Sequence, residues 1–209
     1  IAILDVEAAR RESAGEGVPA QRQSFKTING PAQVWFSKDG SLAFIVSQKV
    51  SLLDVVATNF DGEGRSRPER LVTVDIKAQD PRAFTPFLKT SPDGAEVWLS
   101  HKIADVVSAW TVDRSPKVLD RVDLGQNARP NHVEFVENAR GKFVYVSLAR
   151  VDDGGPGGAA SSRIAIIDRS ASAGSRKVAG QFFSHGREAH GLWTNPEGTR
   201  LYIAHEQDE

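Results

Sequence analysis

A turn containing glycine recurs four times in this chain of 209 residues, and a short apolar strand follows each copy. The four turns are Ser37-Lys38-Asp39-Gly40, Ser91-Pro92-Asp93-Gly94, Asn138-Ala139-Arg140-Gly141 and Asn195-Pro196-Glu197-Gly198. Their glycines lie 54, 47 and 57 residues apart. A unit of this length cannot bury its apolar faces alone, so it must stack on copies of itself. The recurrence therefore predicts a repeat architecture.

Each unit divides into four expected strands, because β-branched and aromatic runs flank the turns. The inner strands come before the turns, at 34–36, 87–88, 132–135 and 191–193, and the second strands come after them, at 42–46, 97–99, 143–146 and 201–204. Third strands are expected at 50–54, 107–113 and 163–168, and outer strands at 70–75, 118–122 and 178–182. The pattern predicts an all-β fold, a β-propeller of four-stranded antiparallel blades with about four blades represented.

We expect one propeller domain over residues 1–209, with blade repeats near 31–77, 84–124, 130–183, and 189–209 plus 1–28. The fourth unit stops after its second strand, and 1–5 and 23–28 have the pattern of its missing third and outer strands. Strands from both ends could share one blade and close the ring, or the chain could be a piece of a longer ring. Propellers have about four to eight blades, and four is a minority, so we favour the larger ring.

The composition excludes several classes of function. Lys plus Arg total 26 and Asp plus Glu total 27, so no overall basic field favours a nucleic-acid partner. No apolar run reaches the roughly 18 to 20 residues of a transmembrane helix, so no transmembrane segment is expected. The absence of cysteine excludes disulfides and thiolate chemistry within these residues. The sequence also has no Gly-x-Ser-x-Gly elbow and no His-Glu-x-x-His zinc pair.

Three segments lie outside the expected strands. Those at 61–68 and 152–162 are rich in glycine and are expected to be exposed loops rather than phosphate cradles. Residues 7–22 have the composition of a short helix, but Gly15 and Gly17 favour a loop.

The repeat resembles that of the YVTN-type β-propellers, whose unit runs Pro-His-Gly-Val-Ala-Val-Ser-Pro-Asp-Gly and continues into strands such as Leu-Tyr-Val-Thr-Asn and Val-Ser-Val-Ile-Asp. The best match is 189–205, Ala-His-Gly-Leu-Trp-Thr-Asn-Pro-Glu-Gly-Thr-Arg-Leu-Tyr-Ile-Ala-His, with further matches at 91–94 and 50–54. The resemblance implies relation to periplasmic and surface binding proteins, lactonase-like sugar enzymes and the haem domain of nitrite reductases. It also implies a periplasmic or secreted location.

The Pro-His-Gly element of that family is intact only near His190. The corresponding positions in the other units are Ala32, Pro86, and either Asn131 or His132, since the third inner strand is displaced by one residue in this alignment. A site repeated around the channel is therefore not expected.

Histidines are the main candidates for metal or haem ligands. His190 and His132 lie where inner strands begin, and His101 and His205 end their second strands, so all four could converge at one end of the channel. Structural roles in the blades are the alternative for each, and no cofactor other than a metal ion or haem is suggested. A second candidate set at the channel rim comprises Arg129, Glu134, Arg187 and Glu206.

Trp35 and Trp193 occupy the same place in their inner strands, and packing between blades is favoured over an exposed stacking platform for sugars or bases. A clear repeat without a convergent catalytic set predicts a binding or scaffold module that holds a protein partner or a small-molecule ligand. The alternatives are a redox or electron-transfer protein with a metal or haem at a mouth lined by histidines, and a lactonase-like sugar enzyme.

Overall fold

The computed structural model describes all residues except 17–21, 64, 79–81, 83 and 209. Three four-stranded antiparallel sheets follow one another along the chain. The first contains β3 (Pro31–Phe36), β4 (Leu42–Ser47), β5 (Leu52–Ala57) and β6 (Glu69–Asp75). The second contains β7 (Phe87–Thr90), β8 (Glu96–His101), β9 (Val106–Thr111) and β10 (Val118–Asp123). The third contains β11 (Pro130–Asn138), β12 (Gly141–Asp152), β13 (Ser161–Asp168) and β14 (Val178–Phe183).

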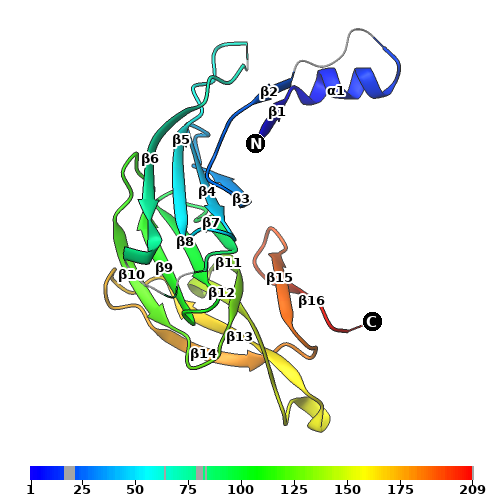
Figure 1. The fold of residues 1–209 in the computed structure, drawn as a ribbon. Coiled ribbons are helices and arrows are strands. Elements are labelled where there is room, and N and C mark those ends of the chain that lie inside the picture. The colour runs from blue at the N-terminus through cyan, green and yellow to red at the C-terminus, as the bar shows by residue number, and fades with distance from the viewer. Residues whose placement is uncertain (17–21, 64, 79–81, 83, 209) are drawn as a thin grey trace.

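Two smaller sheets have two strands each: β1 (Ala2–Leu4) with β2 (Arg22–Ser24), and β15 (Ala189–Thr194) with β16 (Leu201–His205). Short 3₁₀ turns occupy Ile76–Ala78 and Pro156–Gly158. In each larger sheet the strands pair in chain order, and the first strand lies at one edge and the fourth at the other. The first strands β3, β7, β11 and β15 pack in succession, and β6, β10 and β14 lie on the outside (Figure 1). The all-β class and the propeller blades predicted from the repeat are confirmed.

Apolar side chains fill the wedges between neighbouring sheets, because each sheet is too small to bury its faces alone. Between the first and second sheets the core includes Phe44, Leu88 and Trp110. Between the second and third it includes Trp98 and Phe135, whose rings meet edge to face at 6.5 Å. Stacking of adjacent sheets is therefore the main source of stability.

The repeated turn is stabilised by hydrogen bonds from its own side chains. The Ser37 hydroxyl donates to Asp39 at 2.6 Å and accepts from the amide of Leu42 at 2.9 Å, while Gly40 has a φ of 72°. That left-handed conformation is easiest for glycine, which explains the recurring residue. The hydrogen bonds from Ser37 and then Ser41 lower the pKa of Asp39 to about 2.

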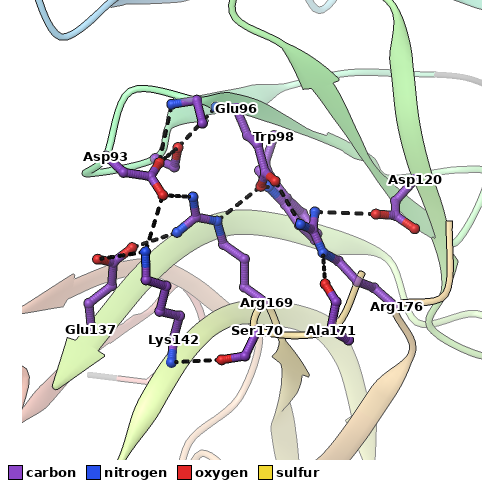
Figure 2. Close-up of polar contacts among 12 residues, drawn as sticks. Asp93, Glu96, Trp98, Asp120, Glu137, Lys142, Arg169, Ser170, Ala171 and Arg176 are labelled. Atoms are coloured by element: carbon purple, nitrogen blue, oxygen red, sulfur yellow. Dashed lines mark hydrogen bonds and ion pairs between the residues drawn. The ribbon is translucent and has the colours of Figure 1, made fainter. Parts of the chain in front are cut away.

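An ionic cluster joins the second and third sheets at the same wedge. Figure 2 shows the guanidinium groups of Arg169 and Arg176 turned toward carboxylates of the second sheet. Arg169 Nε lies 2.9 Å from Glu96 Oε2, Arg176 Nη2 lies 2.7 Å from Glu96 Oε1, and Arg169 also pairs with Asp93. Both arginines are buried, so their charges depend on these partners.

The segment after β1 differs from the sequence prediction. Residues Val6–Ser13 form helix α1, where a loop was favoured. Asp5 caps it by accepting the amide of Ala8 at 2.8 Å, and the helix ends before Gly15, whose φ is 75°. The glycine was therefore a signal for the end of a helix.

The fourth repeat is described as two separate pieces. The β15–β16 and β1–β2 pairs form distinct sheets, without the hydrogen bonding of a common blade in the described residues. Their membership of one blade stays a prediction.

Candidate functional site

Strand register identifies four equivalent positions on the inner strands. Residue pairs at the same place in each hairpin are Trp35 with Phe44, Lys89 with Trp98, Glu134 with Tyr145, and Trp193 with Tyr202. Trp35, Lys89, Glu134 and Trp193 thus occupy corresponding sites on successive first strands. We call the surface formed by the inner strands around these positions the channel face.

The third hairpin pairs closer to its turn than the first, and this is why the sequence alone left Asn131 and His132 as alternatives. Strands β11 and β12 pair as far as Asn138 and Gly141, whereas β3 and β4 stop pairing at Phe36 and Ala43. Counting back from the turn glycine is therefore misleading in this unit. Register places Asn131, not His132, at the position of His190, because Pro130 and Ala189 make equivalent pairs with Leu148 and His205.

The centre of the channel face is an ion pair between two sheets. Lys89 Nζ lies 2.7 Å from Glu134 Oε1 and 2.8 Å from Oε2. The side chains are only 17% and 6% exposed, so the pair is largely shielded from solvent. Glu134 Oε1 also accepts the amide of Phe135 at 2.8 Å, and the Lys89 ammonium lies 5.1 Å from the centre of the Trp35 ring. These contacts hold both charges in place.

A second layer lies toward the start of the inner strands. His132 stacks on Phe87 with ring centres 4.0 Å apart, and it lies 4.9 Å from the ring of His190 and 5.8 Å from that of Trp193. Burial, with the nearby His190 and Lys89, lowers the pKa of His132 to about 4. His132 is therefore an uncharged imidazole at neutral pH.

A cavity of about 570 Å³ opens on the channel face. Its lining comes from the inner strands of four sheets and includes Trp35, Lys89, Glu134 and Thr194, with Asn195 from the following turn. This volume lies in the range of small-molecule pockets, about 300 to 1,000 Å³. Within the described residues, the cavity combines an aromatic surface with hydrogen-bonding groups.

The four predicted histidine ligands are separated into different environments. His132 and His190 are neighbours, and His190 Nε2 lies 3.2 Å from Glu206 Oε1. His101 is buried between Thr85 and Ser108, at 2.9 and 2.7 Å, and His205 contacts Ser184 at 3.0 Å. No group of three or more His, Asp or Glu side chains in the described part of the chain is arranged to hold a metal ion. The metal or haem site stays a prediction.

The predicted rim residues also have different positions. Glu134 is buried on the channel face, and Glu206 is exposed beside His190. Arg129 and Arg187 are exposed, and their amides are held by Asp105 and Asp208, at 3.0 and 2.6 Å. Only Glu134 of this set lines the cavity.

Sequence reasoning missed Lys89 and the exposure of Trp193. Lys89 lies five residues before Gly94, as Trp35 lies before Gly40, so a charge at an aromatic position of the repeat was the available signal. Trp193 is 55% exposed in the structure, and its ring folds over Gly191 toward His132. The packing interpretation for this tryptophan is not supported by the described residues.

Comparison with known proteins supports the fold. No family model matches the chain, and no curated protein matches it. Among solved structures it is similar to a candidate 6-phosphogluconolactonase from Bacteroides uniformis, with 20% identity, a TM-score of 0.67, and coverage of 84% of this chain and 47% of that one. It is also similar to the periplasmic gluconolactonase of Pseudomonas aeruginosa, with 16% identity, a TM-score of 0.64, and coverage of 98% and 56%.

A third similar structure is the Cps50 (Swd1) β-propeller domain of Myceliophteria thermophila, with 13% identity, a TM-score of 0.60, and coverage of 91% and 57%. The chain thus has the fold of a β-propeller and spans about half the length of these proteins. Identities this low show the fold alone. No helix in the described ranges is long and apolar enough to cross a membrane.

Proposed function

We propose that this β-propeller binds a small polar ring on its channel face and hydrolyses a sugar lactone there. The observation that carries the proposal is the Lys89–Glu134 pair beside Trp35 on the cavity wall, with the uncharged His132 in the neighbouring layer, stacked on Phe87. An aromatic face packs against the C–H face of a sugar ring, while charged groups hydrogen-bond its hydroxyls. The 570 Å³ cavity beside this surface is large enough for such a ligand.

His132 is the group we assign as general base. Its ring has no hydrogen-bond partner among the described residues, and it is two residues from Glu134 on the same strand, roughly 6.6 Å along it. A lactone ring that spans this distance would contact both Glu134 and His132. Because His132 is uncharged near pH 7, a nitrogen lone pair is free to accept a proton.

In the proposed reaction, a water oxygen attacks the lactone carbonyl carbon while His132 takes a proton from that water. The ring C–O bond of the resulting tetrahedral intermediate then breaks. The departing ring oxygen receives the proton back from His132, and the product is an open-chain hydroxy acid. The neighbouring His190, paired with Glu206, helps to position the His132 ring.

Two of the similar structures support this choice of substrate class, since they are described as a candidate 6-phosphogluconolactonase and a periplasmic gluconolactonase. A periplasmic or secreted location belongs to the same proposal and is tested by cell fractionation. The scaffold interpretation, with a protein partner on the loops, stays a prediction because no observation at the loops favours a particular partner.

The test is lactone hydrolysis and ligand binding by the full-length protein. Wild type should hydrolyse glucono-1,5-lactone faster than buffer, and His132→Asn should lower the rate by about a hundredfold or more. His185→Asn, at an exposed loop histidine, is the matched control and should keep the rate. Trp35→Ala should weaken binding measured by calorimetry. Absence of both binding and hydrolysis in wild type would overturn the proposal.

A further inference from the structure

We propose that Glu134 makes the channel selective for uncharged ligands, so that the lactone used by this protein carries no phosphate or carboxylate group. This inference rests on the proposed function and specifies its substrate class. Two lysines line the cavity, Lys38 and Lys89. Lys38 is exposed in the turn after β3, so Lys89 is the cation at the centre of the channel face.

The positive charge of Lys89 is already neutralised. Both oxygens of Glu134 contact its ammonium group, at 2.7 and 2.8 Å, and Glu134 is fixed by the amide of Phe135. The Glu134 side chain is only 6% exposed, so an anion that approaches Lys89 must displace Glu134 from these contacts or lie beside it. A phosphate at Lys89 would therefore meet the carboxylate as well as the ammonium. The like charge of the carboxylate then offsets the attraction of the ammonium group.

Apart from the exposed Lys38, the other described groups that face the channel give no compensating positive charge. His132 is uncharged at neutral pH, and His190 faces the carboxylate of Glu206 at 3.2 Å. Glu137, which also lines the cavity, is paired with Arg169, whose guanidinium is directed to the wedge between the sheets. The channel face in the described residues thus offers dipoles and an aromatic surface rather than an anion site.

The same arrangement suits the proposed chemistry. Hydrolysis converts an uncharged lactone into a carboxylate, and this product would be repelled by Glu134. We expect the substrate to bind and the product acid to leave without a strong competing site at Lys89.

The experiment compares wild type with Glu134→Gln, which keeps the shape of the side chain and removes its charge. Calorimetric titrations use glucono-1,5-lactone, 6-phosphogluconate and inorganic phosphate as probes. Wild type should bind the lactone and bind both anions at least about tenfold more weakly. Glu134→Gln should gain at least about tenfold in affinity for both anions, because Lys89 is then unpaired. Glu69→Gln on the outer strand β6 makes the same change in net charge and should gain nothing.

The outcomes separate the two proposals. Tighter binding of 6-phosphogluconate than of lactone by wild type, or unchanged phosphate binding by folded Glu134→Gln, would overturn the selectivity. Failure of wild type to bind lactone, with a gain of phosphate binding in Glu134→Gln, would remove the proposed function and leave the role of Glu134 supported. If Glu134→Gln does not fold, wild-type titrations with the three probes at about 0.05 M salt decide, because charges are screened least there. Both anions should bind at least about tenfold more weakly than the lactone, and equal or tighter binding of either anion would contradict the selectivity.

Discussion

Lys89 and Glu134 connect the inner strands of two neighbouring sheets through two contacts, 2.7 and 2.8 Å from Nζ to the carboxylate oxygens. Each residue stands where other repeats carry tryptophan, at Trp35 and Trp193. The pair thus replaces aromatic surface by complementary charge at the centre of the channel face. It is both a link between blades and the most polar part of the candidate site.

Removing one partner of this pair should destabilise the protein. Lys89→Met leaves the buried Glu134 without its cation, and we expect a loss of about 3 kcal/mol in the free energy of unfolding. Urea denaturation measures this loss. The double variant Lys89→Met with Glu134→Leu should recover most of it, and Lys77→Met, at an exposed lysine, should change little. Equal stability of Lys89→Met and wild type would show that the pair is not shielded as described.

A substitution in the ionic cluster between the second and third sheets should destabilise the protein more than Lys89→Met does. Arg169→Met removes one guanidinium that contacts Asp93, Glu96 and Glu137, so the buried Glu96 and two partly exposed carboxylates lose a partner. We expect about 3 to 5 kcal/mol of destabilisation, measured by chemical denaturation. Arg140→Met, in an exposed turn, is the control and should stay within about 0.5 kcal/mol of wild type. A similarly small effect of Arg169→Met would contradict a structural role for the cluster.

Stability should fall in mild acid because of His132. Its pKa is lowered to about 4 from a usual 6.5, so between these pH values the unfolded chain binds a proton that the native protein does not bind. The free energy of unfolding therefore decreases as the pH falls from about 6.5 to about 4, by about 1 kcal/mol between pH 7 and 5 after allowance for solvent screening. His132→Asn should abolish this contribution, and His185→Asn should retain it. Identical pH profiles for wild type and His132→Asn would refute the assignment.

Gly191→Ala should move the Trp193 ring without removing it. A Cβ atom at residue 191 would collide with the far edge of that indole, which is 55% exposed and free to turn away. We expect little loss of stability but a shifted fluorescence maximum and weaker ligand binding, since the ring leaves His132. Gly180→Ala meets no neighbouring atom and serves as the control. An unchanged emission spectrum of Gly191→Ala would mean that the indole does not lie over this glycine.

The repeat made the fold predictable, because each copy of the turn and its flanking strands gave independent evidence for the same blade. The burial of Trp98 and Phe44 is expected from the apolar second strands in which they lie. The site was harder to predict, since Lys89 and Glu134 are 45 residues apart and meet only when two sheets stack. Strand register shows that Lys89 and Glu134 occupy equivalent positions in the repeat. Counting residues back from the turn glycine does not show this, because the third hairpin is longer.

The helix at Val6–Ser13 was missed for a different reason. Asp5 as an N-cap and Gly15 after the last turn are both helix-boundary signals, but glycine also disfavours the interior of a helix, so the glycines of 7–22 alone favour a loop. The histidines show that equal positions in a repeat do not give equal surroundings. His101 is enclosed by Thr85 and Ser108, whereas the His132 ring contacts other aromatic rings, those of Phe87, His190 and Trp193.

The most direct test of ligand binding on the channel face is a crystal structure of the protein soaked with glucono-1,5-lactone or its stable lactam analogue. We predict electron density for the ring against Trp35, with hydroxyl groups at Lys89 and Glu134 and the carbonyl carbon nearest His132. Density at another surface, or an empty channel at saturating ligand with the same protein folded, would contradict the proposal.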